Sequence, residues 1–199
     1  MKKMKIVKQS VKELNNPSYK SILEKIETAG RTCYQSQSKG EPEKFIKMII
    51  NNGHESVLEH ASLSFVIRTN RNITHEIVRH RLASYSQEST RYVVYKNDIE
   101  FIPSFEDKTY YDFLENAEKQ YKRMLQNSVR PEIARDILPG CLATTIVVTM
   151  NIRELRHFLK LRMFKGAHPQ IRELSVKIFK IIKDKYPVFA SDLEIIFLE

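Results

Sequence analysis

The segment from Arg79 to Arg91 concentrates side chains that bind anions. Its thirteen residues include three arginines, one histidine, three serines and one glutamine. A guanidinium group binds phosphate or carboxylate through paired hydrogen bonds that a lysine cannot reproduce. Apolar residues Ile73 and Ile77 come before this segment and Val93 follows it, so we expect the core to hold it at both ends. This context favours an anion-binding site over the alternative, a solvated basic turn.

The segment from His54 to His60 contains two histidines and two glutamates, which raises the question of a zinc site. Zinc-binding histidines on a helix lie four residues apart, whereas His54 and His60 point to different sides of a helix that turns about 100° per residue. We therefore expect no metal. Glu55 and Glu59 share a helical face and are placed to bracket a polar ligand. An equally open alternative is a helix start whose acids lie near the positive end of the helix dipole.

A third polar segment starts at Asn151, directly after an apolar run, and ends at Arg162. Asn151 is expected to cap the helix that follows it. Arg153, Arg156 and His157 lie three to four residues apart, so their spacing predicts that they line one helical face. The junction between a strand and a helix N-terminus is a common ligand-binding position. An ordinary amphipathic helix explains the same pattern, and both interpretations stay open.

The chain has two cysteines, Cys33 and Cys141, and neither stands beside a histidine. A reactive thiol with a lowered pKa usually has such a neighbour, so the sequence does not predict a cysteine nucleophile. The two residues are too far apart in sequence to form a recognisable metal or redox motif. The absence of a disulfide framework fits a reducing compartment.

Composition limits the class of protein and of partner. The chain has 199 residues, of which 42% are hydrophobic and 29% charged, as expected for one globular domain over residues 1–199. The formal charge of +9 predicts nucleic acid, an anionic membrane or a phosphorylated small molecule as partner, and arginines inside apolar patterns favour the third. No stretch reaches the roughly 18 apolar residues of a membrane span, and no apolar region follows the basic N-terminus. We expect a cytoplasmic protein with no membrane partner.

The coarse pattern predicts an α+β fold with a central, mostly antiparallel or mixed sheet flanked by helices. Alternating apolar residues predict the strands, and Gly, Pro and Asn mark the expected helix ends. Strands are expected at residues 4–14 (with a turn), 62–67, 91–95 and 142–150. Helices are expected at residues 17–30, 42–53, 70–81, 110–126, 131–138, 152–161 and 169–183, with Gly30 and Gly53 as stops.

Taken together, these segments resemble the flavin-dependent thymidylate synthase family. The signature of that family is Arg-His-Arg, then seven residues, then Ser, and here Arg79, His80 and Arg81 precede Ser89 at that spacing. The resemblance runs from about Arg31 to Glu173. The other matching residues, in the family's order and approximate spacing, are Gly53, His54, Glu55, Ser56, Glu59, His60, Ala134, Arg135, Asn151, Ile152, Arg153, His157, Leu161 and Arg162.

The chain departs from the family pattern in three places. Cys33 stands where many members have Ser, and Ser56 replaces a frequent Thr while keeping the hydroxyl. The stretch from Arg162 to His168 is slightly longer than usual. No role is assigned to Cys33 or His168 for this reason.

The resemblance implies methylation of dUMP at C5, which yields dTMP for nucleotide biosynthesis. The implied one-carbon donor is methylenetetrahydrofolate, and the implied cofactor is FAD reduced by NADPH, without a cysteine nucleophile. The resemblance also implies a homotetramer in which several subunits build each active site.

The same resemblance assigns contacts residue by residue. Arg162 corresponds to the arginine that polarises the uracil ring and favours ionisation at N3, so it is the expected catalytic residue. The implied FAD contacts are Ser56, Arg79, His80, Arg81, Leu82, Gln87, Asn151, Arg153 and His157. The implied dUMP contacts are Glu76, Arg79, Gln87, Glu88, Ser89, Thr90, Arg91, Arg135 and Arg162.

A basic nucleic-acid-binding module remains an alternative function. The charge of +9 would suit it, and Tyr85, Tyr92 and Tyr95 would be able to stack on bases. No recognised DNA- or RNA-binding motif occurs, so nucleic acid is not the expected partner. Such a module would show steep salt dependence and no need for flavin. A flavin- or nucleotide-binding regulator without turnover is a third alternative, which the complete set of matched arginines disfavours.

Overall fold

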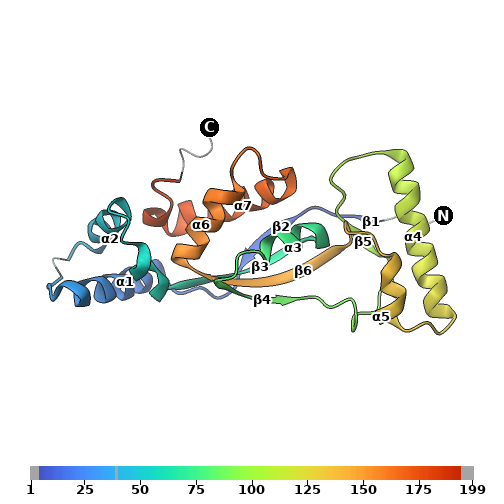
Figure 1. Cartoon of the computed structure of the whole chain (residues 1–199), viewed down its shortest axis with the longest axis horizontal. Helices are drawn as coiled ribbons and strands as arrows, with labels where there is room; N and C mark the ends of the chain where they lie inside the picture. The colour runs from blue at the N-terminus through green and yellow to red at the C-terminus, as the bar shows by residue number, and fades with distance from the viewer. Residues whose placement is uncertain (1–4, 39, 194–199) are drawn as a thin grey trace. The chain divides into compact units, whose positions relative to one another are not determined.

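The computed structural model describes residues 5–38 and 40–193 (Figure 1). The chain divides into two compact units. Each unit is assembled from segments that are far apart in the sequence. The first unit contains the chain up to Ser10, Ile67–Arg79 and Ser86–Val147. The second unit contains Val11–Val66, His80–Tyr85 and the chain from Val148 onward. One domain over residues 1–199 stays a prediction.

The strands form two sheets in the described part of the chain. Their bounds are β1 Lys5–Ile6, β2 Ser10–Glu13, β3 Ser62–Asn70, β4 Ala83–Gln87, β5 Glu100–Phe101 and β6 Ala143–Asn151. β1 and β5 are a parallel pair, and the four-stranded sheet has the order β2-β3-β6-β4. β3 and β6 run antiparallel, because Arg71 N–H donates to the Leu142 carbonyl at one end (3.2 Å) and Ile152 N–H donates to the Ala61 carbonyl at the other (2.9 Å).

Strand β3 illustrates why these sequences form strands. Leu63 and Phe65 are buried, whereas the neighbouring Ser64 and Val66 are half-buried. Successive side chains of a strand point to opposite faces, so a sequence period of two buries one face and leaves the other for polar groups. On that other face the Ser64 hydroxyl shares a 2.8 Å hydrogen bond with the hydroxyl of Thr149 in β6.

Four α-helices of the described residues begin at serine, asparagine or aspartate side-chain caps that the sequence supplies. Ser18, Asn70, Asp107 and Asn151 each accept a hydrogen bond from the backbone N–H three residues later. Such caps satisfy N–H groups that the first helical turn leaves unpaired. The α-helices are α1 Tyr19–Tyr34, α2 Pro42–Asn51, α3 Arg71–Ile77, α4 Lys108–Gln126, α5 Pro131–Ala134, α6 Ile152–Arg162 and α7 Pro169–Lys185. Of these, α2 and α5 begin at a proline without a side-chain cap. The 3₁₀ helices are η1 Glu55–His60, η2 Arg135–Ile137 and η3 Pro187–Phe189.

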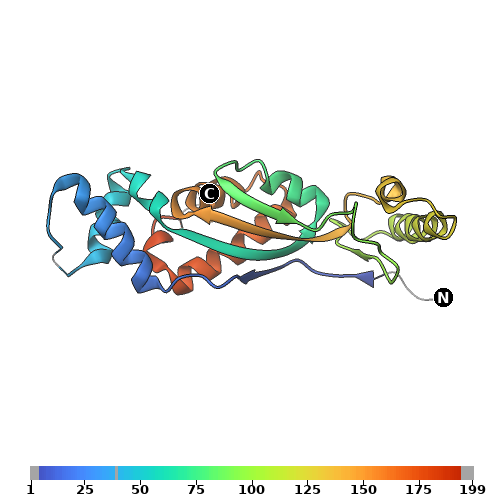
Figure 2. The same cartoon turned by 90° about the horizontal axis from the view of Figure 1, so that it is seen from below.

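Helices pack beside the strands in each unit. In the second unit α6 contacts α7 and η1, and α1 contacts α2 and η1 (Figures 1 and 2). In the first unit α4 contacts α5 and η2, over a core that includes Phe101, Leu114, Tyr121 and Leu142. The predicted α+β fold with an antiparallel sheet flanked by helices is confirmed. Across the described residues, we find no helix with both the length and the apolar content to cross a membrane.

The strand predicted at residues 91–95 is wrong, because this stretch is a turn followed by irregular chain. The Ser89 carbonyl accepts a hydrogen bond from Val93 N–H (2.9 Å), and the Ser89 hydroxyl accepts one from Arg91 N–H (3.2 Å). These local bonds compete with a strand ladder and fold the chain despite its high β propensity. The strand of this region lies earlier, at β4.

The prediction that Gly30 ends the first helix is wrong, because α1 continues to Tyr34. A Cβ atom on Gly30 would lie only 2.7 Å from Cε1 of Phe45 on α2. Glycine is therefore needed here for the close approach of two helices. Gly53, in contrast, follows α2 with φ of +71°, which confirms it as the predicted stop.

Candidate functional site

The predicted site residues divide between the two units. Most predicted flavin contacts lie in the second unit, and most predicted dUMP contacts lie in the first. The second unit holds Ser56, His80, Arg81, Leu82, Asn151, Arg153, His157 and Arg162. The first unit holds Glu76, Arg79, Gln87, Glu88, Ser89, Thr90, Arg91 and Arg135. The catalytic candidate Arg162 thus belongs to the same unit as most of the flavin set.

The Arg79–Arg81 triplet lies between α3 and β4, outside any helix, since α3 ends at Ile77 and not near Arg81 as predicted. Arg79 and Arg81 are exposed, whereas only 5% of His80 is exposed. The Tyr85 hydroxyl donates a 2.5 Å hydrogen bond to the His80 carbonyl, and burial raises the pKa of Tyr85 to about 12, which keeps this donor protonated. The turn therefore presents two guanidinium groups to solvent and directs the imidazole inward.

His80 connects two charged side chains of α6. Its Nδ1 lies 3.0 Å from Oε1 of Glu154, and its Nε2 accepts a 3.1 Å hydrogen bond from Nε of Arg162. Burial lowers the pKa of His80 below its ordinary value of 6.5; the hydrogen bond with Glu154 opposes this shift, and the positive charge of Arg162 adds to it. The imidazole is therefore neutral at pH 7, with its proton on Nδ1.

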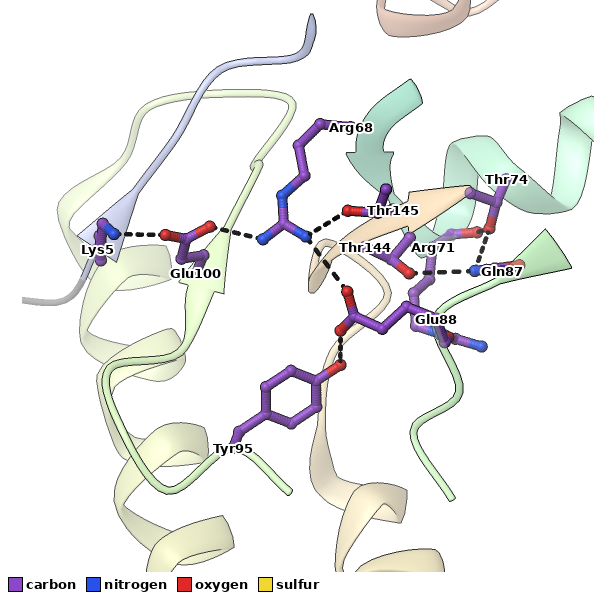
Figure 3. A network of polar contacts seen from close by, with 10 residues as sticks. All are labelled: Lys5, Arg68, Arg71, Thr74, Gln87, Glu88, Tyr95, Glu100, Thr144 and Thr145. Atoms are coloured by element: carbon purple, nitrogen blue, oxygen red, sulfur yellow. Dashed lines mark hydrogen bonds and ion pairs between the residues drawn. The ribbon is translucent and has the colours of Figure 1, made fainter. Parts of the chain in front are cut away.

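Figure 3 shows a polar network in the first unit, centred on the carboxylate of Glu88. Arg68 donates from Nη1 to Glu88 Oε2 at 3.4 Å and to Thr145 Oγ1 at 3.1 Å. Its Nη2 donates to Glu100 Oε2 at 2.6 Å. The Tyr95 hydroxyl donates to Glu88 Oε1 at 2.6 Å, and burial together with this carboxylate raises the pKa of Tyr95 above its ordinary value. Both carboxylate oxygens of Glu88 thus have protein donors, which fixes the orientation of this side chain.

Gln87 is anchored beside this network (Figure 3). Its Nε2 donates to Thr74 Oγ1 at 3.0 Å and to Thr144 Oγ1 at 3.5 Å. Arg71 donates from Nη1 to the backbone carbonyl of Glu88 at 3.3 Å. Donors and acceptors from α3 and β6 therefore hold the two predicted dUMP contacts that end β4 and start the following turn.

Two exposed guanidinium groups of the first unit lie near the turn after Glu88, Arg91 within the turn and Arg135 on η2. Thr90 is buried, and its hydroxyl accepts a 3.3 Å hydrogen bond from Nη1 of the exposed Arg135. The Arg91 side chain is 60% exposed, and its Nε lies 3.5 Å from Oε2 of Glu132. Two exposed guanidinium groups in the same region as the Ser89 hydroxyl supply hydrogen-bond donors of the kind that bind a phosphate monoester.

The second unit exposes a different donor set around the start of α6. Arg153 donates from Nη1 to Glu59 Oε1 at 2.6 Å, and Arg156 donates to the Glu55 carboxylate, so both glutamates predicted to bracket a ligand pair with arginines. Asn151 accepts from the backbone N–H three residues later at 2.8 Å, which confirms it as the helix cap. The exposed members of the predicted flavin set in this unit are Ser56, Arg81, Leu82, Arg153 and His157.

Arg156 does not share the exposed face of α6 with Arg153 and His157, so this part of the prediction is wrong. It is 1% exposed, and it donates from Nη1 and Nη2 to the two carboxylate oxygens of Asp192 at 2.7 and 2.8 Å. Its Nη2 also donates to Glu55 Oε1 at 3.1 Å. At about 100° per residue, Arg156 and His157 diverge, and the turn that exposes His157 buries Arg156.

Several residues of these networks were not predicted as site residues, and Glu154 and Arg68 are two of them. Glu154 is buried within the apolar stripe of α6, and an acid in such a stripe is a signal for a buried partner. Arg68 occupies β3 between apolar neighbours, which is a comparable signal. Neither signal identifies the partner, because His80 and Glu88 stand 74 and 20 residues away in the sequence.

Known proteins similar to this chain include enzymes and one solved structure. A flavin-dependent thymidylate synthase of Mycobacterium avium is 38% identical over 198 residues, covering 85% of this chain and 79% of the relative. A protein of the same name from Geobacter sulfurreducens is 36% identical over 182 residues, covering 82% of this chain and 78% of the relative. The solved UMP/dUMP methylase PolB of Streptomyces cacaoi, bound with 5-Br dUMP, has the same fold with a TM-score of 0.77 at 22% identity, over 94% of this chain and 96% of that chain.

The family model described as thymidylate synthase complementing protein matches residues 18–188, which contain all the predicted site residues. This match and the identity to the Mycobacterium relative confirm what the Arg-His-Arg signature predicted. The chain belongs to the flavin-dependent thymidylate synthase family.

Proposed function

We propose that the chain methylates C5 of dUMP to give dTMP, with methylenetetrahydrofolate as one-carbon donor and NADPH as the source of electrons. The observation that carries this proposal is that the arginines and the histidine of the Arg79–Arg81 signature have different surroundings. Its two arginines are exposed, and its histidine is buried and bonded to Arg162. Such an arrangement provides cations for anionic ligands and one guanidinium that the protein itself orients.

The exposed donor set of the second unit fits a flavin dinucleotide. Arg81 and Arg153 supply guanidinium groups for a diphosphate, while Ser56 and His157 supply a hydroxyl and an imidazole for the sugar or the ring. Arg79 and Gln87 are the predicted FAD contacts from the first unit. FAD, when bound, supplies the redox chemistry that no side chain of the chain provides. The residues themselves bind and orient.

The phosphate of dUMP is proposed to bind at Arg91 and Arg135, with the hydroxyl of Ser89. Hydrogen bonds from a guanidinium group to phosphate are charge-assisted and therefore about twice as strong as neutral ones. The anchored side chains of Gln87 and Glu88 are the proposed contacts to the nucleoside. Glu76, half-buried on α3, completes the proposed dUMP set.

Arg162 is the proposed catalytic residue. Negative charge develops on the pyrimidine when C5 becomes nucleophilic, and a guanidinium group fixed beforehand stabilises that charge without having to reorganise. This electrostatic route needs no thiol. Burial raises the pKa of Cys141, which disfavours the thiolate that covalent activation would require.

We also propose a cytoplasmic homotetramer. Large apolar side chains are exposed in each unit, and surfaces of this kind are commonly covered by association. They include Leu82 (67%) and Phe164 (56%) in the second unit and Phe105 (54%) in the first. The unpaired cysteines Cys33 and Cys141 fit a reducing compartment. Mass photometry should give four times the chain mass, and a monomer mass would contradict the assembly.

Tritium release from C5-tritiated dUMP tests the activity, with FAD, NADPH and methylenetetrahydrofolate each omitted in turn. We expect release with the full set and loss of turnover when any member is omitted. Release that does not depend on FAD would contradict the flavin route. No release from a chain that carries FAD would contradict dUMP methylation itself.

A further inference from the structure

The orientation of Arg162 depends on a buried histidine. Nε of Arg162 donates to His80 Nε2 at 3.1 Å, and His80 Nδ1 lies 3.0 Å from Glu154 Oε1. An arginine only donates hydrogen bonds, and a carboxylate only accepts them. These two neighbours therefore select one form of the neutral imidazole, with the proton on Nδ1 and the lone pair on Nε2.

The elements of the second unit hold this imidazole in place. Glu154, Phe158 and Arg162 are spaced four residues apart on α6, so they form one stripe along the helix. The ring of Phe158 contacts the imidazole edge to face, with 5.0 Å between the centroids. Tyr85 of β4 holds the His80 carbonyl from another side. The acceptor that Arg162 uses is therefore fixed in space.

We propose that His80 is a positioning residue for Arg162. In its Nδ1-protonated form, selected by Glu154, it holds the guanidinium group in the orientation that meets the uracil ring. The inference rests on the proposed function, because it explains how the Arg162 guanidinium group, which is proposed to act on dUMP, is oriented. It gives the His80 side chain a role other than the flavin contact that the family resemblance implies, because this residue is buried and both ring nitrogens have protein partners.

The proposal predicts a dependence on pH. Protonation of His80 removes the acceptor of Arg162 and puts a second positive charge beside it. The charged and titratable groups of the described residues that face the imidazole are Glu154, His157 and Arg162 of α6, and the Tyr85 hydroxyl of β4 lies at the His80 backbone carbonyl. Burial, Arg162 and His157 disfavour the charged imidazole, and Glu154 alone favours it. Turnover should fall with decreasing pH on the acid side of 6.5, as His80 gains its second proton.

Two substitutions separate the two hydrogen bonds of His80. In His80→Gln, the side-chain oxygen reaches the position of Nε2 and accepts from Arg162. In His80→Asn, the shorter amide reaches the position of Nδ1, donates to Glu154 and leaves Arg162 without this acceptor. Because a misplaced catalytic group can cost about 100-fold, we expect that loss in kcat for His80→Asn. We expect His80→Gln to stay within about tenfold of the wild-type kcat, since one net hydrogen bond is at stake.

The measurements are tritium release, dUMP affinity and FAD content of the holoenzyme. Both variants should keep the wild-type dUMP affinity and FAD content, and His80→Gln should also lose the acid limb of the kcat profile. The exposed His75 provides the matched control, because His75→Gln should keep that limb. Equal losses of kcat in both His80 variants, or loss of FAD from both, would overturn the positioning role. An inactive wild-type chain would instead refute the proposed function.

A second measurement does not depend on turnover and is made on the wild-type holoenzyme. The ¹⁵N spectrum of histidine-labelled wild-type holoenzyme distinguishes a proton on Nδ1 from one on Nε2. The His80 signal is assigned by its absence from the spectrum of labelled His80→Gln, or of labelled His80→Asn if His80→Gln does not fold. A proton on Nδ1 at pH 7 is expected. A proton on Nε2, or on both nitrogens, would overturn the proposal.

Discussion

The polar cluster around His80 and the cluster around Glu88 differ in how much water reaches them. The side chains of His80 and Glu154 are 4% and 9% exposed, whereas those of Glu88 and Arg68 are 22% and 28% exposed. Burial of the first cluster fixes a protonation state and a single partner for each nitrogen of the imidazole. Partial burial of the second cluster holds its side chains in place but leaves them within reach of a ligand. Under the proposed function, the first cluster orients a catalytic group and the second binds a substrate.

Two arginines of α6 show the same contrast within one helix. Arg156 is buried and gives its terminal nitrogens to Asp192, Glu55 and the Phe189 carbonyl, whereas Arg162 is half-buried beside His80. A buried guanidinium charge is tolerated when protein partners surround it, and here both terminal nitrogens have such partners. Arg156 therefore stabilises the fold, whereas Arg162, like the exposed Arg153 of the same helix, can reach a ligand.

The largest expected effect is on stability. Arg156→Ala removes the shared donor of the Asp192 and Glu55 carboxylates. Because the Asp192 side chain is 36% exposed, we expect a cost of about 3 kcal/mol, the low end of the range for breaking a buried ion pair. Urea unfolding measures this free energy. Lys177→Ala, which removes an exposed pair with Glu173, is the control and should cost less than about 1 kcal/mol. Equal costs for the two variants would break the distinction between buried and exposed cations.

The next effect is on turnover. Arg162→Ala removes the proposed charge-stabilising group, and losing one such donor costs about 10²–10³-fold in kcat. Tritium release measures the rate, and flavin absorbance measures the FAD that stays bound. We expect FAD content to be unchanged. Near-normal release would contradict the catalytic role.

A smaller effect is expected on substrate affinity. Arg135→Ala removes a charge-assisted contact to the dUMP phosphate, worth about 1.5–3 kcal/mol, or roughly 10- to 100-fold in Kd. The variant should keep its kcat at saturating dUMP. Arg130→Ala, at an exposed arginine that pairs with Glu132, is the matched control and should bind dUMP normally. An unchanged Kd for Arg135→Ala would place the phosphate elsewhere.

The smallest effect concerns the pH dependence of stability. The pKa of His80 is lower in the folded chain than its ordinary value of 6.5, so the unfolded chain binds this proton more readily. The free energy of unfolding should therefore decrease as the pH falls through 6.5. Asp192 has a pKa below 3.8 because Arg156 overcomes the effect of burial, so its own contribution is lost only at lower pH. His80→Gln should show a shallower decrease between pH 7 and pH 5, and an identical slope would refute the buried neutral imidazole.

Local signals in the sequence were sufficient for much of the fold. Ser18, Asn70 and Asn151 cap helices with their own side chains, so each helix start was readable within a few residues. The alternation in β3 was equally local. The strand predicted at residues 91–95 was wrong because another local interaction, the hydrogen bonds of Ser89 to the turn, outweighs the β propensity of these residues.

Partners across long sequence distances were not predictable in the same way. The signature identified His80 and Arg162, but their hydrogen bond joins residues that are 82 positions apart. Glu154, which selects the tautomer of His80, belongs to no recognised motif of the sequence. Arg156 was assigned to the wrong face because spacing alone does not say which side of an amphipathic helix is buried.

The most direct test of the two-cluster account is a dUMP titration into FAD-loaded Arg162→Ala beside FAD-loaded Arg135→Ala, with tritium release measured on the same samples. If the half-buried cluster binds and the buried cluster orients the catalytic group, Arg162→Ala keeps a dUMP Kd within about tenfold of wild type and loses release. Arg135→Ala then shows the larger change in Kd and keeps release at saturation. The reverse pattern, with Arg162→Ala losing affinity and Arg135→Ala losing kcat, would contradict the account.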